Sequence, residues 1–326
     1  MSNHPYDRLN PDLIIDAVES VGYLCDARLL ALNSYENRVY QVGIEDDTPL
    51  IAKFYRPERW TEEQIQEEHR FSLELQDAEI SVVAPLVNAE GRTLHTYEGF
   101  QFALFPRRGG YPPELDNLDN MLVLGRTLGR IHAIGRAGTF KVRHSITVQR
   151  MLTQSREFLL DGFIPEALLP AYESLTADLQ NMVISLYGEV NPEDEIRVHG
   201  DCHVGNILWR DETAHFVDFD DCCTAPAIQD LWMFLNGERH EKQLQLSELV
   251  EGYSEFCEFD PRQIRWIEAL RTMRLIHYAA WLARRWEDPA FPRSFTWFNT
   301  ERYWADHILQ LREQMSALQE EPLQLL

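Results

Sequence analysis

The chain has 326 residues, of which 44% are hydrophobic, 11% aromatic and 25% charged. That length allows roughly two domains or one large two-lobed unit, and the composition disfavours collagen-like, coiled-coil and wholly disordered proteins. With 53 acidic and 30 basic residues the net charge is −23, which disfavours general nucleic-acid binding because phosphate backbones would be repelled.

The first part of the chain has short, strand-like patterns between two helical ones. Residues 1–25 are expected to form a helix, with Pro11 in its first turn. The pattern then predicts three strands within residues 29–54, a helix over 61–75 capped by Thr61 and Gln64, and two strands at 84–88 and 100–105. We therefore expect an N-terminal lobe over residues 1–105, built on an antiparallel sheet with one main helix.

The segment FPRRGG, which begins at Phe105, interrupts this pattern with a proline and paired glycines. Most of the remaining chain has helical periodicity, for example over residues 120–135, 165–186 and 260–286. We expect residues 106–326 to form a helical C-terminal lobe. The fold class is then α+β with two lobes, and small-molecule sites commonly lie in the cleft of such an arrangement.

Residues 198–221 break this helical pattern and contain two short strands. Residues 207–210 and 215–217 are apolar and are separated by the polar turn 211–213, which predicts an antiparallel hairpin. Asn206 precedes the first strand and Asp218 follows the second. These two side chains should therefore meet at the same end of the hairpin, with Asp201 on the preceding loop.

This group of side chains suits phosphoryl transfer. A carboxylate and an amide oxygen can hold a hard cation such as Mg²⁺, which shares its remaining positions with waters and substrate phosphates. The second carboxylate, Asp201, is then free to orient an acceptor hydroxyl. The alternative is that these residues are only turn formers around a hairpin. A zinc site at Cys202 and His203 is disfavoured, because no second pair of ligands accompanies them.

The segments HGDCHVGN and FVDFDD resemble the catalytic loop and metal-binding aspartate of the kinase-like phosphotransferases, which include aminoglycoside, choline and homoserine kinases. The segments LNSYENRVYQ, KFYRPERW, QDLWMFLNG and WLARRWEDPAFP are similar to a bacterial branch of cytoplasmic Ser/Thr protein kinases that act in stress response. The resemblance covers nearly the whole chain. It implies a bilobal protein-kinase-like fold, ATP as co-substrate and Mg²⁺ as cofactor.

The resemblance also assigns roles to individual residues. Asp201 would be the catalytic base, and Asn206 and Asp218 the magnesium ligands, so that Asp218 also belongs to the catalytic set. His199 would hold the loop rather than act as a base. Asp230 would cap a helix or grip the backbone of the catalytic loop, and these two roles are compatible.

The ATP side of the site should contain a lysine on the third strand. Lys53 lies there, between Ala52 and Phe54, and its ammonium would meet the α and β phosphates, although a surface lysine is the alternative. Its partner on the following helix is either Glu67 or Glu68. Glu68 is favoured because it follows the apolar stripe of that helix.

The turn over residues 33–38 occupies the place of the glycine-rich loop of protein kinases, yet it has no glycine. Ser34, Glu36 and Asn37 are therefore the candidates for nucleotide contacts in this turn. The backbone of residues 105–107 should present groups to adenine, with Phe102 or Leu104 lining its pocket.

These inferences together predict an ATP–Mg²⁺-dependent Ser/Thr protein kinase of the bacterial stress response. We expect a cytoplasmic monomer without nucleic-acid or membrane partners, since the five cysteines form no CxxC pair and no run of about 18 apolar residues occurs. The acceptor rests on the resemblance alone, because a fold does not determine its substrate. The alternatives are a small-molecule kinase for an amino alcohol, homoserine or aminoglycoside, and a catalytically silent nucleotide-binding scaffold.

Overall fold

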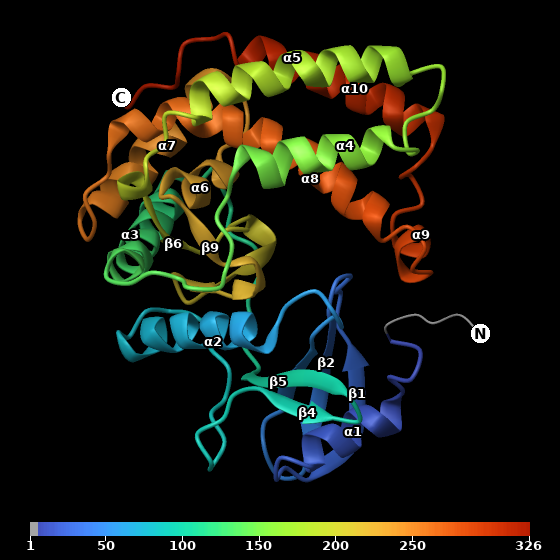
Figure 1. Ribbon diagram of the computed structural model, residues 1–326. Coiled ribbons are helices and arrows are strands. Elements are labelled where there is room, and N and C mark those ends of the chain that lie inside the picture. Colours follow the sequence, from blue (N-terminus) through green and yellow to red (C-terminus); the bar gives the residue numbers. More distant parts are fainter. Residues whose placement is uncertain (1–5) are drawn as a thin grey trace. The chain divides into compact units, whose positions relative to one another are not determined.

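The computed structural model describes residues 6–326 and contains two compact units (Figure 1). The first unit consists of the chain through Glu114 together with Phe140–Arg143 and Asp201–Cys222. The second consists of Leu115–Thr139, His144–Gly200 and Cys223–Leu326. The units therefore alternate along the chain, whereas the sequence predicted a single boundary between residues 105 and 106.

A five-stranded antiparallel sheet forms the centre of the first unit. Its strands are β1 (Cys25–Ala31), β2 (Arg38–Ile44), β3 (Leu50–Phe54), β4 (His95–Tyr97) and β5 (Phe100–Pro106), in the spatial order β1-β2-β3-β5-β4. Strands β2 and β3 lie within residues 29–54, where the sequence predicted three strands, whereas β1 begins earlier, at Cys25. Valine, isoleucine and aromatic residues favour this extended, half-buried backbone.

The two faces of the sheet are covered by different helices. Helix α1 (Pro11–Glu19) lies within the predicted helix over residues 1–25, of which residues 1–5 lie outside the described part of the chain. It packs against one face, which includes Ala52 and Phe102. Because strand side chains alternate between faces, Lys53 and its cross-strand partner Ala103 belong to the other face.

Helix α2 (Glu62–Asp77) covers that second face. Thr61 and Gln64 form a capping box at its start, as the sequence predicted, so two backbone N–H groups of the first turn are satisfied. Ile65 packs with Ala103 of the sheet. This packing places the polar residues in the middle of α2 on the same side of the sheet as Lys53.

The strand predicted over residues 84–88 is wrong. This segment forms no strand, and Leu86 alone donates a backbone hydrogen bond to the Leu104 carbonyl, at 2.7 Å. Pro85 has no N–H to give to a strand ladder. The edge strand is instead β4, which joins β5 through Glu98 and Gly99, both with positive φ as a tight hairpin turn requires.

The predicted hairpin of residues 207–217 is present in the first unit. It consists of β7 (Ile207–Arg210) and β8 (Thr213–Phe216), and its two-residue turn has positive φ at both positions. The second strand begins two residues earlier than predicted because that turn is shorter. Phe216 donates to the Ser81 carbonyl at 2.9 Å, and Tyr111 and Trp209 exchange backbone hydrogen bonds. These contacts explain why the hairpin belongs to the same unit as the sheet.

The second unit is mainly helical, as the fold class predicted. Its helices are α3 (Leu118–Arg136), α4 (Gln154–Leu160), α5 (Leu169–Tyr187), α6 (Ile228–Leu231), α7 (Arg239–Ser254), α8 (Ile267–Arg284), α9 (Ala290–Ser294) and α10 (Glu301–Ala317). Shorter helical turns are Gln149–Thr153, Pro192–Asp194, Trp232–Phe234 and Pro261–Trp266, and the first unit has Val204–Asn206 and Phe219–Asp221.

The long helices α3 and α7 pack closely because glycines line their contact. A side chain at Gly125 or Gly129 would collide with backbone atoms of Leu249 or Tyr253. The same unit holds a two-stranded antiparallel ribbon of β6 (Glu195–Val198) and β9 (Cys223–Pro226). Strand β6 leads directly into the predicted catalytic loop. Within residues 6–326, no helix has the length and apolar character needed to cross a bilayer.

Candidate active site

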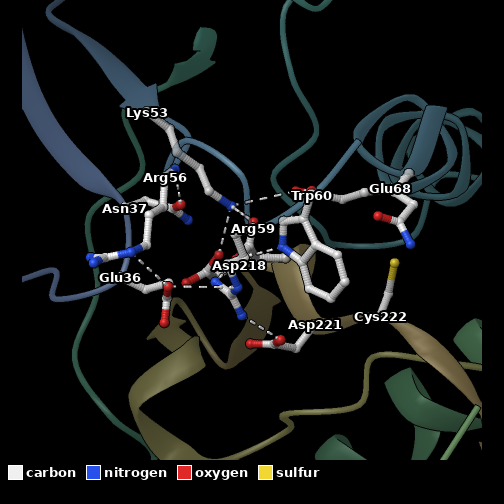
Figure 2. A network of polar contacts seen from close by, with 12 residues as sticks. Glu36, Asn37, Lys53, Arg56, Arg59, Trp60, Glu68, Asp218, Asp221 and Cys222 are labelled. Carbon is white, nitrogen blue, oxygen red and sulfur yellow. Dashed lines mark hydrogen bonds and ion pairs between the residues drawn. The ribbon is translucent and has the colours of Figure 1, made fainter. Parts of the chain in front are cut away.

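Lys53 lies at the centre of a buried group of charges in the first unit (Figure 2). Its Nζ atom is 2.9 Å from Asp218 Oδ1, 3.2 Å from Asp220 Oδ1 and 3.4 Å from Glu68 Oε1. Burial alone would lower the pKa of this ammonium, but the three carboxylates together raise it well above its usual value. Lys53 is therefore a charged, internal lysine and not one on the surface.

Glu68 is the residue of α2 whose carboxylate lies beside Lys53. Its side chain is almost fully buried. Burial raises the pKa of Glu68 to about 7, with Lys53 opposing this rise and Asp220 adding to it. One Lys53 ammonium is thus shared among three carboxylates, and Glu68 receives the longest of the three contacts.

Glu67 has a different function from its neighbour, and the sequence did not indicate it. Its carboxylate accepts backbone hydrogen bonds from Lys141 at 2.8 Å, Val142 at 3.0 Å and Arg143 at 3.0 Å. Burial would raise the pKa of Glu67, but these backbone donors outweigh it and the pKa is lowered. Glu67 therefore attaches residues 141–143 to helix α2.

We expect Glu67→Gln to destabilise the protein by about 1–3 kcal/mol at pH 7, because an amide group would face backbone N–H donors. Folding lowers the pKa of Glu67, so its carboxylate stabilises the folded protein fully at pH values above its unfolded pKa of about 4.5. This stabilisation is lost as the pH falls through the pKa that Glu67 has in the folded protein. Urea unfolding at pH 7 and at lower pH measures both effects. Glu313→Gln on α10, an exposed position, is the control; equal midpoints for the two variants at pH 7 would contradict the prediction.

The loop after β6 places Asp201 next to an imidazole. His203 Nε2 lies 3.4 Å from Asp201 Oδ2, and His203 Nδ1 accepts the Gly205 N–H at 2.9 Å. With Nδ1 accepting this hydrogen bond, the proton of a neutral ring is on Nε2, the nitrogen nearer to the Asp201 carboxylate. A Cβ atom at Gly205 would come within 2.7 Å of the His203 ring in its present position, so a larger residue there would displace the ring. His203 thus orients Asp201, a role that the sequence reading did not assign.

Asn206 and Asp218 lie at the same end of the hairpin. The Val217 N–H donates to the Asn206 carbonyl at 3.0 Å, and Asn206 Nδ2 donates to the Asp201 carbonyl at 2.9 Å. Asp218 has φ 59° and ψ 66°, a left-handed conformation that turns the chain sharply after β8. The Asp218 side chain contacts Lys53 on one side, and about half of its surface is exposed to solvent.

The donor atoms of this group suit a hard cation. Within residues 6–326, no cluster of three or more His, Cys, Asp or Glu side chains could hold a metal ion alone. A carboxylate and an amide oxygen form a partial site, which Mg²⁺ or a similar ion completes with waters and phosphate oxygens. Asp218 already has a cation, the Lys53 ammonium, at 2.9 Å. The residues present therefore fit a metal that is bound together with a nucleotide.

The polar turn that replaces a glycine-rich loop is held by its own side chains. Ser34 Oγ accepts the Val39 N–H at 3.1 Å, and Asn37 Oδ1 accepts the Arg56 N–H at 3.0 Å. Glu36 Oε1 lies 3.7 Å from Arg56 Nε, and both Glu36 and Asn37 are buried. These contacts fix the shape of a turn that has no glycine.

Two residues of β5 lie on the opposite face from Lys53. Phe102 and Leu104 belong to the core that packs against α1, so the expectation that one of them lines an adenine pocket beside Lys53 does not fit. The alternation of side chains places Ala103 and Phe105 on the Lys53 face instead. The sequence had no indication of which face is covered by which helix.

In the second unit, Asp230 binds the backbone that precedes the predicted catalytic loop. Its carboxylate accepts the N–H groups of His199 at 2.7 Å and Gly200 at 2.8 Å, and it contacts His132 Nε2 at 2.9 Å. Asp230 is fully buried in α6, where Ala227 is the N-cap residue, so it is the loop anchor but not the helix cap. His132 was missed because nothing in the sequence connects it with Asp230.

Two arginines close to the site were also missed. Arg143 donates to the carbonyls of Cys222 at 2.6 Å and Gln64 at 3.1 Å, and also to that of Asp220. Arg59 contacts the carboxylate of Asp220 and also that of Asp221, which is labelled in Figure 2. Arg59 lies in KFYRPERW, a segment singled out only for its resemblance, while residues 140–143 show no signal of their own.

A comparison with known protein families assigns this chain to one of them. The model of the phosphotransferase enzyme family matches residues 28–267, which include Lys53, the predicted catalytic loop and the hairpin. This chain belongs to the phosphotransferase enzyme family. Membership implies a nucleotide phosphoryl donor and a divalent metal.

Curated relatives are similar over almost their entire length. The stress response kinase A of Escherichia coli O157:H7 is 48% identical over 98% of this chain and 97% of its own. The serine/threonine protein kinase RdoA of Salmonella typhimurium is 46% identical over the same shares. The predicted resemblance to bacterial stress response kinases, and to stress response kinase A in particular, is confirmed.

Solved structures confirm the predicted kinase-like fold. The amicoumacin kinase hAmiN, solved with AMP-PNP, Ca²⁺ and amicoumacin, has a TM-score of 0.77 at 18% identity and covers 98% of this chain and 95% of its own. A microcompartment-associated aminopropanol kinase has a TM-score of 0.70 at 18% identity, covering 93% and 97%. At these identities the likeness concerns the fold alone.

Proposed function

We propose that this member of the phosphotransferase family is a Ser/Thr protein kinase that transfers the γ-phosphoryl group of ATP with Mg²⁺. The observation that carries the donor half of this proposal is the contact between Lys53 and Asp218, at 2.9 Å. It joins a β3 ammonium to a carboxylate 165 residues away in the chain. Phosphoryl transfer relies on positioning and charge neutralisation. The Lys53 ammonium would neutralise phosphate charge, and the Asp218 carboxylate would hold the metal.

Lys53 would bind the α and β phosphates, with Glu68 holding the ammonium in place. To reach the phosphates, Lys53 must exchange its contact with Asp218 for one with the nucleotide. Asp218 and Asn206 would then hold Mg²⁺, which when bound neutralises phosphate charge. Ser34, Glu36 and Asn37 would shape the turn over the phosphates, and the contacts that fix this turn support such a role.

Asp201 would orient the acceptor hydroxyl and receive its proton. Its side chain is one-quarter exposed, so an oxygen of the carboxylate can be reached from solvent. His203 supports this role, because its Nε2 atom lies 3.4 Å from Asp201 Oδ2, next to the carboxylate that would receive the proton. The backbone of the loop is independently held by Asn206, which binds the Asp201 carbonyl and not its carboxylate.

The acceptor is proposed to be a serine or threonine of a protein. Support comes from the relatives that are 46–48% identical over 98% of this chain, which are named stress response kinases and a serine/threonine protein kinase. The structural neighbours named for small-molecule acceptors are much less similar, at 18% identity. A cytoplasmic location is also proposed, since the five cysteines, all within the described residues, form no disulfide.

The test is an assay with γ-labelled ATP and Mg²⁺ on two sets of acceptors. One set is a dephosphorylated bacterial lysate, and the other is a panel of amino alcohols, homoserine and aminoglycosides. We expect label on serine or threonine of proteins, located by mass spectrometry, and none above background in the panel. Label confined to the small molecules would overturn the acceptor. Absence of transfer to either set, with ATP still bound, would favour a nucleotide-binding scaffold.

A further inference from the structure

Arg59 is a buried cation that no step described above uses. It lies in the loop between β3 and α2, and its side chain is only 12% exposed. Its guanidinium contacts Asp220 Oδ2 through Nη1, lies 2.6 Å from Asp221 Oδ1 through Nη2, and has Nε 3.9 Å from Glu36 Oε1. Trp60 packs against it, 5.0 Å from ring to guanidinium (Figure 2). Such a site holds the guanidinium in one orientation.

Asp220 has two cations beside its carboxylate. Arg59 contacts one oxygen, and Lys53 lies 3.2 Å from the other. The side chain is only 4% exposed, so water cannot replace either partner. The Asp220 carboxylate is therefore held between the Lys53 ammonium on one oxygen and the Arg59 guanidinium on the other. Arg143 is also close, but its hydrogen bond goes to the Asp220 backbone carbonyl.

Lys53 and Arg59 have different roles in the proposed reaction. In the proposed function Lys53 moves its charge toward the nucleotide phosphates, whereas Arg59 has no such task. If Arg59 were absent, the buried Asp220 carboxylate would have Lys53 as the one cation in contact with it. Lys53 would then be held against Asp220 and Glu68, and the nucleotide would have to separate a buried ion pair in order to bind.

We propose that Arg59 is a positioning residue for nucleotide binding: by neutralising Asp220, its guanidinium leaves the Lys53 ammonium available to the phosphates. This inference rests on the proposed function, in which Lys53 binds those phosphates. Asp220, the second acid of the segment FVDFDD, is then paired with Arg59 and does not depend on Lys53. Arg59 is expected to have an effect on ATP affinity that is larger than its effect on the chemical step.

The experiment compares ATP–Mg²⁺ affinity, by calorimetry, with kcat and KM in matched variants. Arg59→Gln should raise the Kd and KM for ATP at least about tenfold while kcat changes less. Arg59→Lys keeps the charge and should stay closer to wild type. Arg59→Gln combined with Asp220→Asn removes both the cation and the carboxylate that needs it, and should return the Kd to within about threefold of wild type. Arg156→Gln is the control: Arg156 binds Thr176 in the second unit, and its substitution should leave the Kd for ATP unchanged.

Each outcome decides the matter. A folded Arg59→Gln variant with unchanged ATP affinity overturns the inference, and so does a loss of affinity that Asp220→Asn fails to restore, which would mean a purely structural role. If Arg59→Gln does not fold, the Asp220→Asn variant provides the test. It removes a carboxylate that holds Lys53, so its Kd for ATP should not exceed that of wild type, and a higher Kd would overturn the inference. If wild type itself does not bind ATP–Mg²⁺, the proposed function fails, which is a different result from an ineffective Arg59 variant.

Discussion

The Asp201→Asn variant is expected to lose phosphoryl transfer by about 10²–10⁴-fold in kcat, the usual range for a positioned acid or base. An asparagine cannot accept the hydroxyl proton, although it has nearly the same shape. The KM for ATP should change little, because the ATP side of the site is built around Lys53 and Asp218 and not around Asp201. Steady-state transfer of labelled phosphate to protein acceptors, with separate kcat and KM values, measures the effect.

The structure explains why this variant should fold. Asn206 Nδ2 and the His203 N–H both donate to the backbone carbonyl of Asp201, which the substitution leaves intact. Asp178→Asn on α5, an exposed aspartate, is the matched control and should retain wild-type activity. Equal kcat for Asp201→Asn and wild type would remove Asp201 from the mechanism.

The Asp218→Asn variant is expected to lower kcat/KM on the order of 10³-fold, since the metal would lose its one carboxylate ligand. The concentration of Mg²⁺ needed for half-maximal activity should rise as well. Binding of ATP without metal should not weaken, because Lys53 would be released from its shortest contact. Activity titrated against Mg²⁺, together with calorimetry of metal-free ATP, separates these effects.

Asp211→Asn is a control on the same hairpin. Asp211 lies at the opposite end, is 88% exposed and has positive φ, a conformation that asparagine also tolerates. It should have wild-type kinetics. If Asp218→Asn and Asp211→Asn behave alike, with the same requirement for Mg²⁺ as wild type, Asp218 is not a metal ligand.

Local patterns were sufficient to predict the elements that carry the site. The hairpin followed from two apolar runs around a polar turn, and its geometry alone places Asn206 and Asp218 at one end. The apolar stripe of α2 likewise favoured Glu68 over Glu67, and Glu68 is the one beside Lys53. These predictions depend on residues that are near in sequence and on the fixed periodicities of strands and helices.

Predictions that needed the neighbours of an element were less successful. The strand over 84–88 is wrong because Pro85 interrupts it and β4 takes the place at the sheet edge. Phe102 and Leu104, which were expected to line the adenine pocket, are buried in the core against α1, since alternation gives two faces but does not say which helix covers each. The compact units also differ from the predicted boundary, because the hairpin bonds to Ser81 and Tyr111 of the first unit.

The sequence by itself determined the family, the hairpin of residues 207–217 and the lysine on β3, since each is a short pattern visible in its own residues. The catalytic and metal-binding roles of the loop and hairpin remain predictions. Only the tertiary structure decided which charges meet. Lys53 contacts Asp218 and Asp220, Glu67 holds residues 141–143, and Arg59 neutralises Asp220. Partners so far apart in the chain are selected by burial, because an ionised group removed from water must find an opposite charge or a hydrogen bond wherever the fold provides one.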